Sequence, residues 1–479
     1  MLPLLLACTG AVPDTAVLPE TGDTGTVPTP PPPPPAAPPP NLLVIIADDV
    51  GITSLDGFGR PGDAFPVTPA IDSLVARGVR FPNAYANPVC TPTRFTALTG
   101  RYVRRRGVGR PIFRNEDFET SLDEVSLAQV LEARGYTSLA LGKWHLSSDE
   151  SETNYAHPLL FGFEHHGFIQ RLDYWDWLRN DVGELSIDPR YQATALADDT
   201  IHYANTTPGP WLIWAGFLSA HDPIHVPPAE LNVRGVTNAS PELEKYFAMI
   251  EAMDLEIGRM LTSIDPDVLD DTIIVFLGDN GTIAEFVPTD WVPQRGKGST
   301  YEGGVNVPLV VAGPGIAEGV DSEVLVHTAD LFPTLIELAG IDLDAFSVTT
   351  VGHWDEVADG AEAPWLDGWD RPGEPIVVDG ASFAPSLVDP EAPGRRRYIY
   401  TERFWPKGPP PYPNDIVALR DERFKLMDDR GVTLFFDLEG RADDGPDLLT
   451  EPLSAEASEA YDRLTAVMSA HSTTLVYEP

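Results

Sequence analysis

The chain has 479 residues, more than the roughly 250–300 at which a single hydrophobic core stops growing, so a large domain with a smaller companion is expected. Its 32 basic and 73 acidic residues give a formal net charge of −41, which argues against a nucleic-acid partner and requires any anion to bind in a local basic pocket. No run of about 18 apolar residues occurs, so no membrane-spanning helix is expected.

Residues 1–40 are predicted to form a signal and a linker. A short apolar run ends at Cys8 and resembles the cleavage box of a bacterial lipoprotein, in which the cysteine is lipidated. That interpretation predicts an exported protein, periplasmic or at the cell surface, with a membrane tether through Cys8. The run is shorter than a normal signal peptide and lacks a positive start, so an unstructured apolar N-terminus is the alternative. Residues 9–40 are rich in Thr, Gly and Pro, which favours a stiff polyproline tether.

The folded region is expected to begin at residue 41 with a catalytic domain over residues 41–390. A continuous apolar run at 42–47 is typical of a strand buried on both faces of a parallel sheet, and similar runs recur at 137–141, 211–217, 272–277 and 307–312. Helical patterns lie between them, at 69–77 with Thr68 as the cap, at 126–134 and at 242–264. The alternation predicts an α/β fold with a large, mostly parallel central sheet flanked by helices.

The sequence pattern changes towards the C-terminus, where a smaller antiparallel-sheet subdomain is predicted over residues 391–479. Short strand-like runs separated by charged turns occur at 398–401, 416–420, 424–427 and 433–437. An apolar stripe follows at 457, 461, 464 and 468, which predicts a closing helix. The acidic segment 343–378 shows no periodicity and is interpreted as a surface insertion.

Polar side chains follow four of the predicted buried strands. In chain order they are Asp48 and Asp49, then Lys143 and His145, then His221, and finally Asp279 and Asn280. Because ligands of open α/β sheets bind beyond the carboxyl ends of the strands, this convergence predicts a single site. Its carboxylate and amide oxygens are hard donors, which favour Ca²⁺ or Mg²⁺ over a thiolate-rich zinc site.

Residues 90–100 carry the most specific motif, with Cys90, Pro92 and Arg94 followed by Leu-Thr-Gly. This segment is similar to the signature of the formylglycine-dependent sulfatases, arylsulfatase-like members of the alkaline phosphatase superfamily, in which a maturation enzyme oxidises the cysteine to formylglycine. The resemblance extends from residue 41 to about residue 450. It includes further family-like blocks around Lys143-Trp144-His145, His221-Asp222-Pro223, Asp279-Asn280-Gly281 and Gly296-Lys297-Gly298.

The resemblance implies hydrolysis of a sulfate ester with release of inorganic sulfate. Formylglycine made from Cys90 would act as its hydrate: one hydroxyl attacks sulfur, and deprotonation of the other expels sulfate, a release that a serine nucleophile lacks. The substrate would be a sulfated small molecule or glycan. The divalent ion, Ca²⁺ or Mg²⁺, would be held by Asp48, Asp49, Asp279 and Asn280.

The resemblance also assigns the supporting roles. Arg94 would orient the hydrate, and Lys143 and Lys297 would bind the sulfate oxygens. His145 would accept the proton during sulfate release, and His221 would protonate or bond the leaving oxygen. His225 competes with His221 for the last role, although the spacing to the following prolines favours His221.

Two other functions remain open from the sequence. The first is a phosphonate monoester or phosphodiester hydrolase of the same fold; that group usually has Asp-His in the second metal segment, where this chain has Asp279-Asn280. The second is a catalytically idle, surface-tethered binding lipoprotein. Substrate choice is expected to depend on loops at 147–190, 228–241, 283–295 and 343–378. The basic run 101–106 is interpreted as a solvated turn that offsets acidic neighbours, in preference to a polyanion-binding surface.

Overall fold

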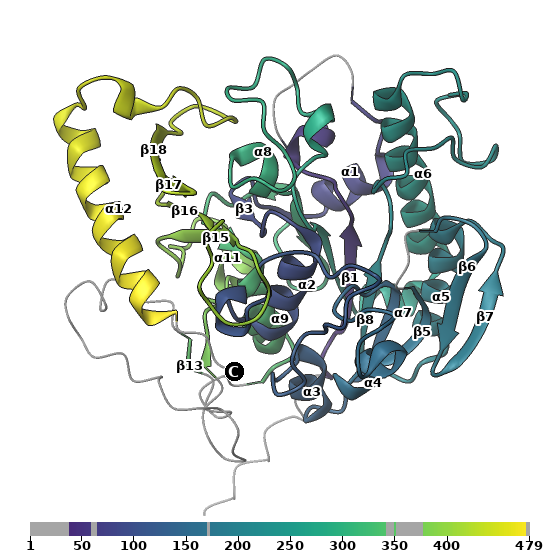
Figure 1. Cartoon of the computed structure of the whole chain (residues 1–479). Coiled ribbons are helices and arrows are strands. Elements are labelled where there is room, and N and C mark those ends of the chain that lie inside the picture. Colours follow the sequence, from purple (N-terminus) through teal and green to yellow (C-terminus); the bar gives the residue numbers. More distant parts are fainter. Residues whose placement is uncertain (1–37, 59–64, 170–172, 342–348, 351–376, 476–479) are drawn as a thin grey trace, which may run out of the picture. The chain divides into compact units, whose positions relative to one another are not determined.

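The computed structural model describes residues 38–58, 65–169, 173–341, 349–350 and 377–475 (Figure 1). A ten-stranded sheet forms its centre, and the order of the strands across it differs from their order in the chain. From one edge to the other the strands are β11 (Val320–Asp321), β2 (Gly78–Arg80), β10 (Leu309–Ala312), β9 (Thr272–Gly278), β1 (Asn41–Ala47), β8 (Trp211–Gly216), β4 (Thr137–Lys143), β5 (Glu164–Ile169), β6 (Trp177–Asp181) and β7 (Glu184–Asp188).

The middle of the sheet is parallel, which confirms the predicted fold class. Strands β9, β1, β8, β4 and β5 run in one direction, whereas β10 is antiparallel to β9 and β6 is antiparallel to β5. The register aligns the strand ends, because Ile46 of β1 lies level with Gly216 of β8 and with Leu277 of β9. The residues that follow these strands therefore emerge side by side at one edge.

Strand β1 shows why its sequence is continuously apolar. Its side chains alternate between two hydrophobic cores, with Leu42, Val44 and Ile46 on one face and Leu43 and Ile45 on the other. Burying each such side chain contributes about 1.5–3 kcal/mol. The first core is covered by α2 (Cys90–Thr99), α3 (Leu127–Glu132) and α9 (Leu331–Leu338), and the second by α1 (Pro69–Ala76), α5 (Gln192–Thr206) and α6 (Glu242–Ser263) (Figure 1).

Two of the predicted helices differ in how they begin. Helix α3 starts with a capping box in which Ser126 accepts a hydrogen bond from the backbone N–H of Gln129. Thr68 makes no side-chain cap on α1, so that prediction is wrong. The Asp254 carboxylate on α6 instead accepts hydrogen bonds from the first N–H groups of α1, at 3.0 Å and 2.8 Å. Burial raises the pKa of Asp254 to about 6.

The C-terminal part contains the predicted antiparallel sheet and closing helix. Strands β15 (Ile399–Arg403), β16 (Ile416–Arg420), β17 (Phe424–Asp429) and β18 (Val432–Asp437) pair in chain order, and α12 (Ala455–Thr474) packs against them through Ala457, Ala460 and Leu464. Most of the predicted insertion at 343–378 lies outside the described residues. Within it, β13 (Thr349–Thr350) pairs with β14 (Val377–Val378).

The basic run 101–106 is not a solvated turn, so that interpretation is corrected. Arg101 and Arg105 are buried, and they pair with Glu124 and Asp379 at 3.0 Å and 2.6 Å. Arg104 pairs with Glu402 at 2.7 Å. The arginines do offset acidic residues, but these come from distant parts of the chain, so the run is committed to internal pairing and offers no polyanion-binding surface.

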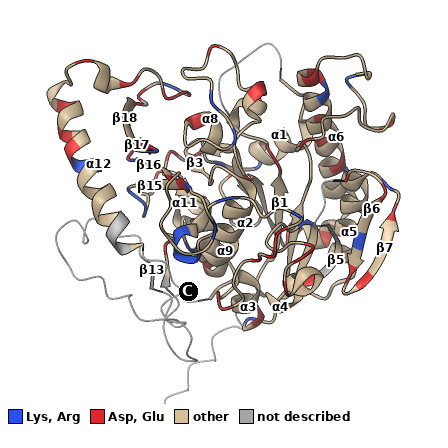
Figure 2. Ribbon diagram, in the orientation of Figure 1, with Lys and Arg blue, Asp and Glu red and all other residues tan. Residues whose placement is uncertain are grey.

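Acidic residues are spread over the surface, as expected for a net charge of −41. Figure 2 shows Asp and Glu along α6, α12 and β7. Among the helices in the described ranges, none is both long enough and apolar enough to cross a bilayer.

A buried ionic network joins the C-terminal sheet to the part of the chain that contains the central sheet. The Lys425 ammonium on β17 donates to Glu302 and to Asp444, both at 2.8 Å, and all three side chains are buried. The Tyr85 hydroxyl donates to the other oxygen of Glu302 at 2.7 Å. Glu302 begins α8 (Glu302–Val305), which directly follows the loop that carries Lys297.

We expect Lys425→Met to lower the free energy of unfolding by about 3–5 kcal/mol, because it leaves two buried carboxylates without their cation. Urea unfolding followed by circular dichroism measures the change. The matched control is Arg423→Met, which breaks surface ion pairs on the preceding turn and should have a much smaller effect. Equal effects of the two substitutions would contradict a structural role for the buried network.

Candidate active site

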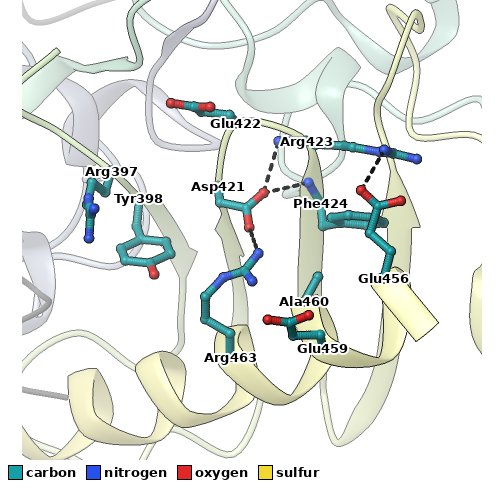
Figure 3. Close-up of a pocket in the computed structure, with 10 residues that line it drawn as sticks. All are labelled: Arg397, Tyr398, Asp421, Glu422, Arg423, Phe424, Glu456, Glu459, Ala460 and Arg463. Atoms are coloured by element: carbon teal, nitrogen blue, oxygen red, sulfur yellow. Dashed lines mark hydrogen bonds and ion pairs between the residues drawn. The ribbon is translucent and has the colours of Figure 1, made fainter. Parts of the chain in front are cut away.

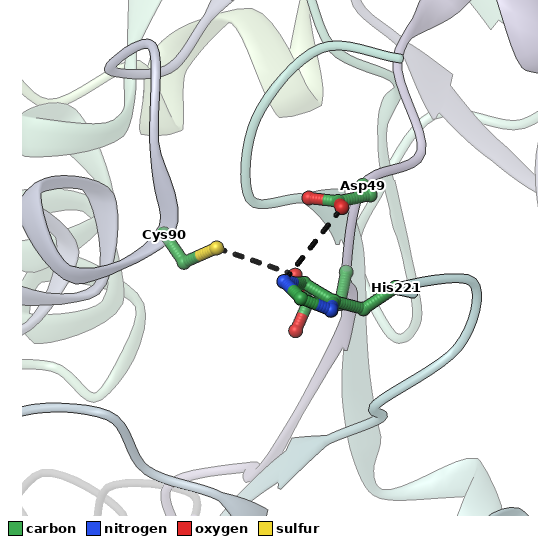
Figure 4. Close-up of side chains that lie close together, drawn as sticks. Asp49, Cys90 and His221 are labelled. Carbon is green, nitrogen blue, oxygen red and sulfur yellow. Dashed lines mark hydrogen bonds and ion pairs between the residues drawn. The ribbon is translucent and has the colours of Figure 1, made fainter. Parts of the chain in front are cut away.

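The ends of β1, β4, β8 and β9 bring the predicted residues together. The ligand atoms of Asp48, Asp49, Cys90 and His221 all lie within 4.8 Å of one another, and Figure 4 shows Asp49, Cys90 and His221 pointing toward a common centre. Asp279 contacts this cluster through the backbone N–H of Asp49, at 3.3 Å. The sequence places His221 among the catalytic residues, and the structure also makes it a candidate ligand.

Cys90 is the first residue of α2. Its side chain is 1% exposed, and its Sγ donates to Asp48 Oδ1 at 3.4 Å. Burial, together with the carboxylates of Asp279 and Asp48, raises the pKa of the Cys90 thiol well above its usual value. The unmodified thiol is therefore protonated, and a protonated thiol is a poor nucleophile. A nucleophile at this position would require chemical conversion of the cysteine.

Arg94 lies one turn further along α2 and is completely buried. Its guanidinium donates twice to Asp279 Oδ2, at 3.1 Å and 2.9 Å, and once to the Lys143 carbonyl at 2.7 Å. Gly216 allows this approach, because a Cβ there would lie 2.5 Å from the same carbonyl. The guanidinium is therefore held by three hydrogen bonds in one orientation.

Asp48 and Asp279 experience opposite electrostatic environments. Burial alone would raise the pKa of Asp48, but Lys143, which donates to its Oδ2, and the neighbouring His221 hold it well below the ordinary value. Burial and the nearby Asp48 raise the pKa of Asp279 to about 6. An additional cation nearby would therefore stabilise the charged form of Asp279.

Asp49 is fixed by two side chains from other loops. Asn280 donates to its Oδ1 at 2.8 Å, and Lys297 donates to its Oδ2 at 2.8 Å. Asp49 and His145 adopt left-handed backbone conformations, with φ of 61° and 68°. Such conformations cost about 1–3 kcal/mol each and concentrate at functional sites.

The donor set fits a divalent cation. The Asn280 amide uses its nitrogen to donate to Asp49 and to the Gly281 carbonyl, which orients the amide. Its Oδ1 is buried and has no hydrogen-bond partner in the described part of the chain. A buried carbonyl oxygen of this kind requires a donor or a cation. Together with the carboxylates of Asp48 and Asp49 it offers oxygen donors of the kind that hard ions prefer.

The histidines occupy distinct environments. His145 places Nε2 3.0 Å from the Ile112 carbonyl, which can only accept, so the ring proton is on Nε2. Nδ1 is buried without a partner among the described residues, and burial, Lys143 and Arg94 hold the pKa of His145 well below its usual value. His145 is therefore a neutral imidazole with a free basic nitrogen.

His221 lies closer to the cluster than its competitor. Its Nδ1 is 2.7 Å from the Asp222 carbonyl, and its Nε2 is 3.9 Å from Asp49 Oδ2. The Nε2 of His225 instead contacts the Tyr191 hydroxyl at 3.0 Å, and its ring packs 4.1 Å from that of Tyr174. This geometry favours His221 as the histidine that serves the site.

Several residues that support the site carry no sequence signal. Thr91 donates to the His145 carbonyl at 2.8 Å, Tyr246 donates to the Asp49 carbonyl at 2.6 Å, and Tyr174 donates to the His221 carbonyl at 2.7 Å. Each fixes the backbone of a site residue from a distant segment. They form no motif, so only the fold identifies them.

Comparison with known proteins is consistent with this geometry. The Sulfatase family model matches residues 40–341. Arylsulfatase J of Mus musculus is 26% identical over 329 residues, which are 63% of this chain and 53% of the relative, so the chain spans about half the length of that protein. The solved structure of Ps i-CgsB has a TM-score of 0.73 at 22% identity and covers 91% of this chain and 93% of its own. A phosphonate monoester hydrolase of Agrobacterium radiobacter has a TM-score of 0.62 at 21% identity, with coverage of 90% and 96%.

Proposed function

Because the chain belongs to the sulfatase family, we propose that it hydrolyses a sulfate ester and releases inorganic sulfate. The observation that carries the proposal is the position of Cys90, at the start of α2 and in contact with Asp48. Lys143 donates to Asp48 and Lys297 donates to Asp49, two carboxylates that have an oxygen within 4.8 Å of Cys90 Sγ. A helix N-terminus with two ammonium groups is a setting that stabilises a bound anion, even in a protein of strongly negative charge.

Two groups beyond the unmodified chain complete the proposal. Formylglycine, made from Cys90 by a formylglycine-generating enzyme, would supply an oxygen nucleophile that is regenerated in each turnover. A divalent ion, Ca²⁺ or Mg²⁺, would be held by Asp48, Asp49, Asp279 and Asn280 and would supply charge to polarise the sulfate. Asn280 Oδ1, which has no hydrogen-bond partner among the described residues, and the raised pKa of Asp279 support this ligand set.

The chain's own residues would position the reactants. Arg94, held by Asp279 and the Lys143 carbonyl, presents a fixed cation beside residue 90 and would orient its side chain. The ammonium groups of Lys143 and Lys297 would each donate hydrogen bonds both to an aspartate and to the sulfate oxygens. Their fixed charges would stabilise the charge that develops on those oxygens during ester cleavage.

The two histidines would divide the proton transfers. His145, neutral and with Nδ1 free, would accept the proton whose removal from residue 90 releases sulfate. His221 would act as an imidazolium: its Nδ1–H donates to the Asp222 carbonyl, and its Nε2 would give the second ring proton to the leaving oxygen, which leaves a neutral imidazole. The roles differ because one imidazole is buried beside two cations and the other faces a carboxylate.

We expect His221→Ala to lower kcat about 10²–10⁴-fold on a sugar or alkyl sulfate, whose leaving oxygen needs a proton. The loss should be smaller on an aryl sulfate with an acidic phenol. His225→Ala is the matched control and should change either rate less than about tenfold, because its ring packs against Tyr174 and Tyr191. Steady-state kinetics on both substrates make the comparison, and a larger loss for His225→Ala would reassign the role.

The second candidate function is phosphonate monoester or phosphodiester hydrolysis. The likeness to the Agrobacterium radiobacter enzyme concerns the fold, and Asn280 stands where that group usually has a histidine. We therefore favour the sulfatase. The decisive experiment matures the protein with a formylglycine-generating enzyme, confirms the altered mass of the peptide containing Cys90, and compares turnover of an aryl sulfate with that of an aryl phosphonate monoester. Faster release of phosphonate than of sulfate would reverse the choice.

The setting of the enzyme is also a proposal. Residues 1–40, outside the described part except for 38–40, would be a lipoprotein signal and linker, which would place an exported enzyme in the periplasm or at the cell surface. Residues 41–390 would form the catalytic domain and residues 391–479 the C-terminal subdomain. Labelling with a lipid precursor, compared between the native chain and Cys8→Ala, tests the tether.

A further inference from the structure

A cavity rich in arginine lies between the Lys297 loop and the C-terminal sheet. It has a volume of about 500 Å³, and we call it the arginine cavity; its walls include Arg295, Ser299, Thr300, Arg403, Trp405 and Arg430. Cavities of this size accommodate small ligands. Asp429 is the one carboxylate among the lining residues, and it pairs with Arg430 at 2.7 Å.

The two remaining arginines lack a counter-ion. Within the described residues, no carboxylate oxygen lies within 4.0 Å of the Arg295 or Arg403 guanidinium. Arg403 donates to the Gly298 carbonyl at 2.7 Å, which leaves most of its donors unused. Burial, and then repulsion by Arg430, lower the pKa of Arg403, although a guanidinium remains charged at neutral pH. A bound anion would relieve this repulsion.

Another arginine-lined cavity of the same part of the chain shows the contrast. It has a volume of about 430 Å³ and lies against α12 (Figure 3). There Arg463 points to Asp421 at 2.6 Å, and Arg423 points to Glu456 at 3.1 Å (Figure 3). Two of its three arginines are thus paired with carboxylates that line the same cavity. The arginine cavity differs because two of its three arginines, Arg295 and Arg403, have no such carboxylate partner among the described residues, in a protein of net charge −41.

The arginine cavity adjoins the candidate active site. Gly298, in its wall, follows Lys297 directly, and its N–H donates at 2.7 Å to the carbonyl of Pro88, two residues before Cys90. Trp405, which also lines the arginine cavity, is 41% exposed, and the Arg110 guanidinium lies 3.7 Å from the centroid of its ring. Arg110 belongs to the loop whose Ile112 carbonyl contacts His145. A substrate held at residue 90 could therefore extend into this cavity.

The cavity also offers groups that suit a hydroxylated ligand. Ser299, Thr300 and Asn414 line it, and Thr300 Oγ1 is buried without a hydrogen-bond partner in the described ranges. Guanidinium forks match sulfate and carboxylate oxygens, and exposed tryptophan rings pack against the apolar faces of sugars. Anion-binding and hydroxyl-binding groups therefore occur together.

We propose, building on the sulfate ester hydrolysis proposed above, that the arginine cavity binds a second anionic group of the substrate. That group is a sulfate or a carboxylate on a sugar next to the one being desulfated. The substrate class is then an anionic sulfated oligosaccharide that carries at least one charge beyond the ester that is cleaved. Small monosulfates would reach the reaction centre without this contact and would be poorer substrates.

The test compares two substrates of the matured protein, an aryl monosulfate and a disulfated disaccharide that contains a uronate. For Arg295→Gln and for Arg295→Gln with Arg403→Gln, we expect the ratio of kcat/KM on the disaccharide to kcat/KM on the aryl sulfate to fall about tenfold or more, mainly through KM. Arg463→Gln, which removes an arginine from the other cavity, should leave the ratio unchanged. An unchanged ratio in the Arg295 and Arg403 variants overturns the proposal.

A binding measurement separates this proposal from the proposed reaction. Calorimetric titration of the disaccharide into Cys90→Ala protein should show binding that weakens with salt and is lost in the Arg295→Gln, Arg403→Gln background. If wild-type matured protein hydrolyses neither substrate but this binding persists, the reaction fails and the anion site stands. If aryl sulfate is hydrolysed but the arginine substitutions leave binding intact, the site fails and the reaction stands.

Discussion

Cys90→Ala is expected to lower sulfate release by about 10⁴-fold or more, because loss of a covalent nucleophile commonly costs this much or more. The fold should persist, since α2 tolerates alanine at its first residue and the Cys90 side chain makes one hydrogen bond to the described residues, to Asp48. Turnover of an aryl sulfate by matured protein gives the rate. Circular dichroism and the midpoint of urea unfolding give the fold.

Cys90→Ser separates the aldehyde mechanism from an ordinary nucleophile. A serine could be sulfated once but has no second hydroxyl through which to expel sulfate, so we expect at most one slow turnover. Mass spectrometry of the peptide containing residue 90 should then detect the sulfated serine. Normal steady-state turnover by this variant would falsify the proposed mechanism.

Asp279→Asn should have the next largest effect, through the cation. Substitution of the residue keeps its volume but removes the carboxylate that pairs with Arg94 and that is proposed to hold the ion. We expect kcat/KM to fall roughly 100-fold or more, since even residues one step removed from a metal commonly cost 10–100-fold. Excess calcium should partly restore the rate, and the calcium content after dialysis, measured by atomic emission, should be lower.

The matched control for this prediction is Asp254→Asn. Asp254 is another buried aspartate whose pKa is raised to about 6, but it binds the start of α1 instead of the site. The Asp254→Asn protein should be less stable than the wild type but should keep its calcium content. If both variants lose calcium to a similar extent, the loss in Asp279→Asn comes from general destabilisation of the fold and does not identify Asp279 as a ligand.

The central sheet and the site cluster were predictable because their signals are local. A buried parallel strand needs a continuous apolar run, so β1 and β9 are visible in the sequence, and the residue after such a strand must emerge at the sheet edge. Asp48 and Asp279 meet for this reason. The motif that begins at Cys90 is contiguous, so it required no knowledge of the fold.

The features that sequence reasoning missed depend on contacts between distant residues. Asp254 replaces Thr68 at the start of α1 although 186 positions separate them in the sequence. The arginines at 101–106 are buried because Glu124, Asp379 and Glu402 reach them from three other segments. The arginine cavity likewise combines residues from the Lys297 loop and the C-terminal sheet. Neither the composition nor the periodicity of the sequence predicts contacts between residues so far apart in the chain.

The ion pairs of Lys425 with Glu302 and Asp444 have a consequence for shortened versions of the protein. Ending the polypeptide near residue 390 would remove the ammonium group and Asp444 together and would strand Glu302 in the interior just after the Lys297 loop. Such a fragment would keep every residue of the reaction centre and still lose activity. The C-terminal sheet should therefore be kept together with the central-sheet part in any shortened version of the protein.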